Sequence, residues 1–152
     1  MDERLAHKQL LKQYGELIIL QRITIARQAM DNAQAAANEE EKSSAGDKYE
    51  TARAMSHLEK DMHARQLLAH QQELNALRAI DTGSICVIPA PGAFVKCTTT
   101  GFFIVAGLGK QVVNGEEVIF LSPLSPLAQQ LMRKRIGENI DFKGKTQIIN
   151  VY

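Results

Sequence analysis

The chain opens with an apolar repeat that no proline interrupts. Apolar side chains recur at alternating spacings of four and three residues, which is typical of the seam of a two-helix coiled coil. Toward its end the repeat uses mostly alanine, so a partner helix can approach closely there. The pattern predicts a long helix from Glu3 to about Lys42. Its seam consists of Ile19, Ile23, Ala26, Met30, Ala33 and Ala37.

Residues 43–47, Ser-Ser-Ala-Gly-Asp, predict the point at which the chain reverses. Gly46 tolerates unusual backbone angles, and Ser44 with Asp47 three residues later forms an acidic variant of a capping box. We therefore predict an antiparallel helical hairpin over residues 1–80, with its tip at about residues 41–47. Arms of this length would span roughly 50 to 60 Å, so we expect the hairpin to protrude. The predicted seam of the second arm consists of Met55, Leu58, Met62, His70, Leu74 and Leu77.

After Gly83 the pattern changes to short runs of β-branched and aromatic residues, which predict strands. Turn signals separate these runs, and Asn114-Gly115 is the strongest hairpin signal among them. One helix is predicted from about Ser125 to Arg135. The whole predicts an α+β fold, in which a two-helix coiled coil precedes a small, mostly antiparallel sheet domain over residues 84–152. The predicted strands cover residues 84–88, 94–98, 102–106, 118–121, 139–142 and 147–152.

The 152 residues have an ordinary soluble composition, with 45% apolar and 23% charged residues. The formal net charge of +1 gives no general attraction for nucleic acid, which argues against direct specific binding to DNA. The longest strongly apolar run, residues 17–20, is far shorter than the roughly 20 residues of a membrane span. The Asp-Glu-Arg start also lacks the order of a signal peptide. We therefore expect a cytoplasmic protein with no membrane partner.

Cys86 and Cys97 both fall in predicted strands. A lone pair of cysteines without a signal peptide is more often two buried thiols than a disulfide. The four histidines repeat no metal-binding motif, and none is placed by the sequence to activate either sulfur. The chain also lacks a phosphate-binding glycine loop, a nucleophile elbow and the His-Glu-x-x-His and Cys-x-x-Cys motifs. We expect no stably bound cofactor, and the sequence argues against an enzyme in its own right.

Two stretches of the chain resemble the bacterial Gre family of transcript-cleavage and elongation factors. The first is Ser-Pro-Leu-Ser-Pro-Leu at residues 122–127, which leads through Leu-Met-Arg-Lys-Arg-Ile-Gly-Glu at residues 131–138 to a terminal Ile-Asn-Val-Tyr. The second is Asp-Lys-Tyr-Glu-Thr-Ala-Arg at residues 47–53, which is similar to the stretch that follows the family's hairpin tip. With the hairpin itself, the resemblance covers nearly the whole chain. It implies that the sheet domain is FKBP-like.

The resemblance also implies a partner and a mechanism. In this family the sheet domain docks at the rim of the secondary channel of RNA polymerase, and the hairpin passes down the channel toward the active centre. Tip carboxylates help to hold a magnesium ion there, so that the polymerase hydrolyses the end of its own backtracked transcript. The implied protein is a monomer that contacts RNA polymerase and, within the complex, nascent RNA. Magnesium would bind only in complex with the polymerase.

The tip departs from the family pattern where the acids belong. The usual tip reads Asp-Leu-Ser-Glu-Asn-x-Glu-Tyr, and aligning its tyrosine on Tyr49 places Lys42, Ala45 and Lys48 at the three acidic positions. A different turn could still bring Glu41 and Asp47 together as the tip carboxylates. Alternatively, the Glu run is only a solvated helix end. The sequence therefore favours polymerase binding over cleavage.

By this resemblance the catalytic and metal-binding candidates are Glu41 and Asp47, which would assist the polymerase. The candidate polymerase-binding residues are Glu39, Glu40, Tyr49, Arg53, Ser122, Pro123, Arg133 and Lys134. Three alternatives stay open: a channel-binding regulator without cleavage activity, an FKBP-like prolyl isomerase and a self-associating coiled-coil adaptor. An aromatic content of 5% with no tryptophan argues against the isomerase. The residues that favour the adaptor are Leu10, Leu11, Leu17 and Leu20, which we expect to be exposed.

Overall fold

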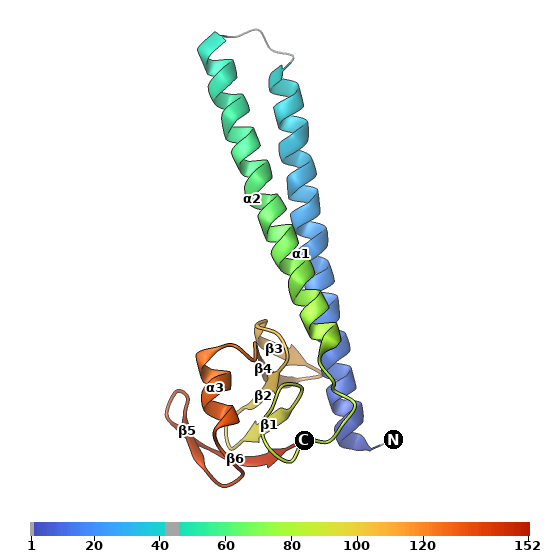
Figure 1. Ribbon diagram of the computed structural model, residues 1–152, viewed down its shortest axis with the longest axis vertical. Coiled ribbons are helices and arrows are strands. Elements are labelled where there is room, and N and C mark those ends of the chain that lie inside the picture. Colours follow the sequence, from blue (N-terminus) through green and yellow to red (C-terminus); the bar gives the residue numbers. More distant parts are fainter. Residues whose placement is uncertain (1, 42–45) are drawn as a thin grey trace. The chain divides into compact units, whose positions relative to one another are not determined.

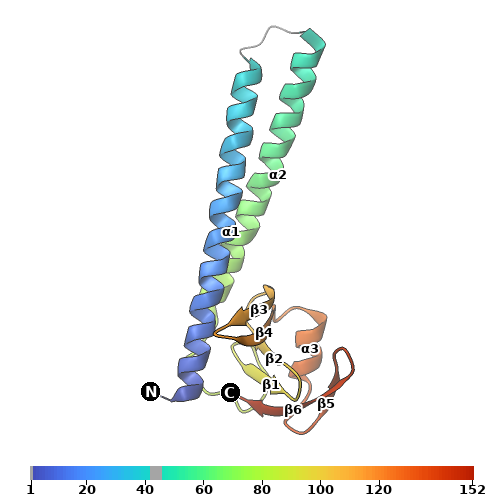
Figure 2. The same cartoon turned by 180° about the vertical axis from the view of Figure 1, so that it is seen from behind.

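The protein is an α+β structure of three helices and a six-stranded sheet over its described residues. The structure, a computed structural model, describes residues 2–41 and 46–152, and among these the side chains of residues 40, 41 and 46–49 are not described. Figures 1 and 2 show the elements from opposite sides. In chain order they are α1 (Glu3–Glu41), α2 (Gly46–Ala79), β1 (Phe94–Cys97), β2 (Gly101–Ile104), β3 (Gly109–Val113), β4 (Glu116–Leu121), α3 (Pro126–Met132), β5 (Asn139–Asp141) and β6 (Lys145–Val151).

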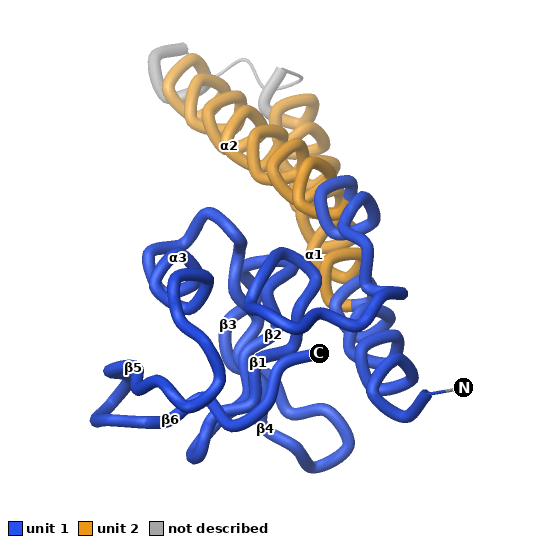
Figure 3. Tube along the Cα trace, turned by 60° about the horizontal axis from the view of Figure 1, so that its bottom comes forward, with its two compact units in different colours: residues 1–17, 75–152 blue, residues 18–74 orange. Residues whose placement is uncertain are grey.

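The chain divides into two compact units, which Figure 3 colours separately. One unit is Ile18–Leu74, and the other joins Met1–Leu17 to Asn75–Tyr152. The first turns of α1 therefore belong to the same unit as the sheet. The predicted division into residues 1–80 and 84–152 instead keeps the whole hairpin in one part of the chain, and it stays a prediction. No helix within the described residues is long and apolar enough to cross a lipid bilayer.

In the unit Ile18–Leu74, α1 and α2 run side by side in opposite directions (Figures 1 and 2). The predicted seam of α1 is confirmed at five of its positions, which are buried, while Met30 is half-buried. Small alanines at this seam let the helix backbones approach closely. The buried seam residues are Ile19, Ile23, Ala26, Ala33 and Ala37.

The predicted seam of α2 is wrong in its first half. Met55, Leu58 and Met62 are 57%, 64% and 42% exposed, so this apolar stripe does not pack against the described part of α1. The half-buried stripe next to it is mostly polar and includes Ala52, Ser56, Lys60 and His63. Spacing identifies both stripes equally well, because both repeat at intervals of four and three residues. The second half is confirmed: Leu74 and Leu77 are buried and His70 is half-buried.

The six strands form one sheet in the order β3-β4-β2-β1-β6-β5. The pairs are antiparallel except for β2 with β4, which run parallel. Two tight hairpins have positive φ at both central residues, Asn114 with Gly115 and Lys143 with Gly144. Such turns match the twist of the strands that they join, which confirms the Asn-Gly signal and explains the register of β3 with β4. Strand β3 itself was not predicted from the sequence.

Two local predictions were wrong. Residues 84–88 form no strand: the Ser84 carbonyl accepts a hydrogen bond from a lysine side chain, and Pro89 cannot donate to a neighbouring strand. Helix α3 ends at Met132, not Arg135, because the backbone that follows it turns and forms a hydrogen bond to β6. The Gly137 amide donates to the Ile148 carbonyl at 2.8 Å, which draws the backbone out of the helix.

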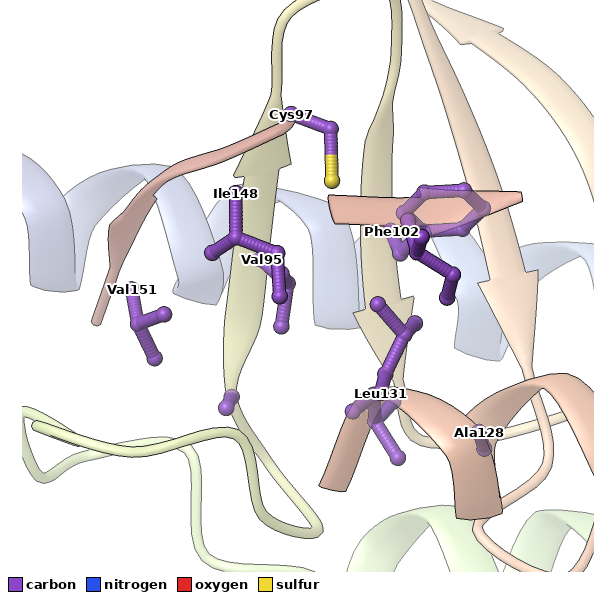
Figure 4. Close-up of a cluster of buried hydrophobic side chains, with 10 residues drawn as sticks. Val95, Cys97, Phe102, Ala128, Leu131, Ile148 and Val151 are labelled. Atoms are coloured by element: carbon purple, nitrogen blue, oxygen red, sulfur yellow. The ribbon is translucent and has the colours of Figure 1, made fainter. Parts of the chain in front are cut away.

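Both faces of the sheet are covered. On one face, Ala128 and Leu131 of α3 pack against side chains of β1, β2 and β6, as Figure 4 shows. The central strand β2 is buried throughout, so its other face must be covered as well. On that face, rings of the sheet contact α1: Phe120 lies 6.5 Å from Tyr14 and Phe94 lies 4.8 Å from His7, between ring centroids. The sheet unit therefore has a core on each face.

The C-terminal Tyr152 is tied to α1 through a chain of hydrogen bonds. Its hydroxyl lies 2.7 Å from His7 Nδ1, and His7 Nε2 lies 3.2 Å from Glu116 Oε2. Because an ionised carboxylate only accepts, Nε2 carries the proton toward Glu116, and in neutral His7 the Tyr152 hydroxyl donates to Nδ1. Burial, helped by the nearby Glu116 charge, raises the pKa of Tyr152 to about 12. Tyr152 thus stays protonated and holds the chain end against the base of α1.

Candidate functional site

The turn before α3 presents the first predicted docking residues. Ser122 and Pro123 are half-buried, and their oxygens are used within the turn. The Leu124 amide donates to Ser122 Oγ at 3.2 Å, and Gln129 Nε2 donates to the Pro123 carbonyl at 2.7 Å. Ser125 then caps α3, since its hydroxyl accepts from the Ala128 amide. These bonds fix the turn and leave Leu124 86% exposed at its surface.

Three consecutive cations follow the end of α3. The Arg133 amide donates to the Gln130 carbonyl at 3.2 Å and the Lys134 amide donates to the Leu131 carbonyl at 3.0 Å, which caps the end of the helix. Lys134 Nζ lies 3.8 Å from Glu138 Oε2, and Arg135 donates to the Lys134 carbonyl at 2.9 Å. The Arg133 side chain is exposed and forms no ion pair with a described residue in the structure. Cations are favoured at this end of a helix by its dipole, so their presence alone does not indicate a ligand.

A groove of about 430 Å³ lies beside these cations. It combines the end of α3 with β5, and its lining carries two cations and one carboxylate. The residues that line it are Gln130, Arg133, Lys134, Asn139, Ile140 and Asp141. The groups are hydrogen-bond donors and acceptors on a surface, with no nucleophile paired to a base. This arrangement can bind a polar or acidic segment of a partner.

Two of these lining residues, Arg133 and Lys134, were predicted from the sequence, and the others were not. Gln130 could have been found, because it precedes Arg133 by three residues and so shares its side of the helix. Asn139 and Asp141 come to the groove only through the pairing of β5 with β6. No local signal marks them. Leu124 was part of the quoted motif but had not been singled out.

The other predicted site is the end of the hairpin. Residues 39–41, all Glu, occupy the last turn of α1, and that turn carries no basic residue. The C-terminal end of a helix dipole is negative, so three carboxylates there are unfavourable for helix stability. Asp47, in the first turn of α2, sits at the end where the dipole favours an acid. The helix dipole therefore accounts for an acid at Asp47. It does not account for the three glutamates at residues 39–41.

The structure describes only part of this predicted site. Glu39 on α1 and Arg53 on α2 are exposed. The side chains of Glu40, Glu41, Asp47 and Tyr49 lie outside the described residues, so the pairing of Glu41 with Asp47 stays a prediction. Where side chains are described, no three His, Cys, Asp or Glu residues gather as a metal site would require.

Compared with known protein families and with curated proteins, the chain matches none. Two surfaces of the molecule are the candidates for a functional site. One is the acidic end of the hairpin, and the other is the groove at the end of α3, which we call the α3 groove and define by its six lining residues.

Proposed function

We propose that this protein is a transcription factor of the Gre type that binds in the secondary channel of RNA polymerase. In this proposal the α3 groove docks on the polymerase and the hairpin carries its acidic end toward the active centre. The factor modulates elongation there. It acts on the polymerase's own chemistry and has no separate active site.

The observation that carries the proposal is the Glu run in the last turn of α1. Three carboxylates at the negative end of a helix dipole are unfavourable for the stability of that helix, and the last turn of α1, as described up to Glu41, has no basic residue in its sequence. A function other than stabilising the folded chain accounts for acids at this position. Near a polymerase active centre, carboxylates can share a magnesium ion, since such sites use one or two protein carboxylates and complete the shell with phosphate.

The shape of unit Ile18–Leu74 supports the same proposal. Residues 18–41 of α1 alone extend about 36 Å at the helical rise of roughly 1.5 Å per residue. Its seam is narrow, because alanine fills it toward the acidic end, where Ala33 and Ala37 are 4% and 0% exposed. A slender pair of helices suits a channel that a globular domain could not enter.

A set of Glu variants tests the role of the hairpin end. We expect the triple variant Glu39→Ala/Glu40→Ala/Glu41→Ala to bind RNA polymerase as the wild type does and to lose its effect on elongation or on cleavage of backtracked transcripts. Removing these charges should not weaken the fold, because they oppose the helix dipole. The measurement is the rate at which purified polymerase extends and cleaves a stalled transcript.

The matched control is the variant Glu50→Ala/Glu59→Ala, which removes exposed carboxylates from α2 beyond the first turn. It should behave as the wild type. If wild type binds and alters elongation while the RNA stays uncut, the factor is a channel-binding regulator without cleavage activity. Equal activity of the triple variant and the wild type would show that the Glu run is only a solvated helix end.

A second candidate function is a coiled-coil adaptor, and one observation favours it. Leu17, Ile25 and Leu58 are 60%, 69% and 64% exposed, and large exposed apolar side chains can contribute to an interface between copies of the chain. Leu11, expected to be exposed, is instead 1% exposed and belongs to the core. Sedimentation would show a concentration-dependent dimer if self-association used these residues.

The prolyl isomerase alternative has less support from the structure. A proline pocket needs accessible aromatic rings, and Phe94, Phe102, Phe103 and Phe120 are each at most 1% exposed. Their rings pack on one another and on the helices. A proline-peptide isomerisation assay would distinguish this alternative, since we expect no acceleration.

A further inference from the structure

The segment that follows α2 lies along the base of α1. Lys8 Nζ donates to the Ser84 carbonyl at 2.7 Å, and Lys12 Nζ donates to the Ile80 carbonyl at 3.0 Å. Because position 8 of the helix meets position 84 and position 12 meets position 80, the segment runs antiparallel to the helix and Thr82 lies between the two lysines. These residues all belong to the sheet unit, so their arrangement is defined within one compact part of the molecule.

A cavity of about 520 Å³ lies between this segment and the helix. Five of its lining residues, from Leu5 to Glu16, share one face of α1, and the other two are Thr82 and Gly83. A small-molecule site usually has a volume of roughly 300 to 1,000 Å³ and a few polar groups that converge on it. The cavity has such a volume, and its ligand must suit the polar groups that the lining leaves unpaired.

Thr82 is a buried polar residue whose hydroxyl is unpaired. The residue is only 8% exposed, and its hydroxyl forms no hydrogen bond with any residue that the structure describes. Its oxygen is not one of the sealed, unpaired side-chain atoms of the described chain, so it opens into the cavity that Thr82 lines. Buried hydroxyl groups are nearly always hydrogen-bonded, so this one is available to a ligand.

Lys12 and Glu16 line the same cavity one helical turn apart, and neither side chain is fully paired. The Glu16 side chain is 29% exposed, and the cation nearest to it among the described ion pairs is Arg78, whose Nε lies 3.8 Å from Glu16 Oε1. That distance is too long for a hydrogen bond. The Lys12 ammonium has three donors, of which the Ile80 carbonyl takes one. A cation and an anion with free hydrogen-bonding capacity therefore lie on one side of the cavity.

Asp81 is the other acid near Lys12, and its oxygens serve the turn that follows α2. They accept from the Gly83 amide and from the Ser84 hydroxyl, both at 2.8 Å. These two bonds, the Gly83 amide first, lower the pKa of Asp81, and the charges of Lys8 and Lys12 contribute less. Lys12 therefore keeps donors that can bind an anion in the cavity.

We propose that this cavity binds a free α-amino acid. The carboxylate of the ligand accepts from the Lys12 ammonium and from the Thr82 hydroxyl, and the ammonium of the ligand donates to the Glu16 carboxylate. A simple anion would leave Glu16 unpaired, and a simple amine would leave Lys12 and Thr82 unpaired, so a ligand with both charges fits the lining best. Leu5, at the other end of the lining from Glu16, offers an apolar contact to the ligand's side chain. The proposal uses no residue of the α3 groove or of the hairpin end and does not depend on polymerase binding.

Isothermal titration calorimetry on the full chain, with each standard L-amino acid as a probe, tests the proposal. We expect at least one amino acid to bind with a dissociation constant of about 1 mM or lower. Its two analogues, the acid without the amino group and the amine without the carboxylate, should each bind about tenfold or more weakly, because each lacks one charged hydrogen-bonding group. If no amino acid binds at concentrations up to about 10 mM, or if either analogue binds as tightly as the amino acid, the proposal is wrong.

Three variants locate the site. Thr82→Val removes the hydroxyl and breaks no described hydrogen bond, so it should weaken amino-acid binding by about tenfold and leave the fold intact. Lys12→Met should weaken binding by at least as much, because it removes a charged donor. Glu16→Gln should remove the preference for the amino acid over the analogue without the amino group, since that analogue has nothing to donate to Glu16.

Glu3→Gln is the matched control, because it makes the same change at an exposed position of α1 that does not line the cavity. It should bind the amino acid as the wild type does. Circular dichroism of each variant shows whether it is folded, and Thr82→Val is decisive because it breaks no described bond. Unchanged binding by folded Thr82→Val, or an equal loss in Glu3→Gln and Glu16→Gln, would overturn the proposal.

Discussion

Gly92→Ala is expected to lower the free energy of unfolding by about 3 kcal/mol or more, from a backbone collision together with positive-φ strain. Gly92 has a φ of +90°, a conformation that a residue with a Cβ rarely adopts. A Cβ at this position would also overlap the carbonyl oxygen of Asp81, which is backbone and cannot rotate away. The Gly92 amide donates to the Ile104 carbonyl at 2.7 Å, so moving the segment would break a bond to β2.

Gly109→Ala is the control for this prediction. Gly109 also has positive φ, at +72°, but an added Cβ there meets no atom within 4 Å. This variant should lower the free energy of unfolding by only about 1 kcal/mol, which is the cost of placing a residue with a Cβ at positive φ. Urea unfolding of both variants, followed by circular dichroism, measures the two costs. If both variants lower the free energy of unfolding equally, the segment before β1 can move away from Asp81.

Reversing two charges of the α3 groove is expected to weaken binding to RNA polymerase by about tenfold or more. The variant is Arg133→Glu/Lys134→Glu. Both side chains line the groove, and the Lys134 side chain is half-buried, so an acidic partner surface would meet two new carboxylates next to Asp141. Like charges placed opposite one another across an interface oppose association. The fold should survive, because neither side chain belongs to the core.

The control for this variant is Lys96→Glu/Lys110→Glu, which makes the same change in net charge on exposed positions of β1 and β3. Co-sedimentation with purified polymerase at several salt concentrations would measure both variants. The control should bind as the wild type does. A similar loss for both variants would mean that net charge, and not the α3 groove, governs binding.

Much of the fold could be predicted from local patterns. The spacing of apolar residues on α1 found the buried seam, because burial on a helix follows its own period. Asn114-Gly115 found its hairpin, since that turn needs residues that tolerate positive φ. Met55, Leu58 and Met62 could not be assigned correctly, because spacing does not say which of two neighbouring stripes meets the partner helix.

The remaining errors came from contacts between distant parts of the chain. Residues 84–88 have strand-like composition, yet Lys8 bonds to the Ser84 carbonyl from more than 70 residues away. Leu11 was predicted to be exposed, but it is buried because the first turns of α1 belong to the sheet unit. Of the candidate site, Arg133 and Lys134 could be found from the motif, whereas Asn139 and Asp141 depend on tertiary structure.

Site-specific cross-linking from the end of α1 tests the proposed function most directly. A photoreactive residue in place of Glu39, which is exposed, would be activated in a mixture with RNA polymerase that holds a stalled transcript. The account predicts cross-links to the polymerase active centre or to the RNA 3′ end, while the same residue in place of Lys96 on β1 gives none there. A Glu39 variant that cross-links to neither, although the protein is bound to the polymerase, would contradict it.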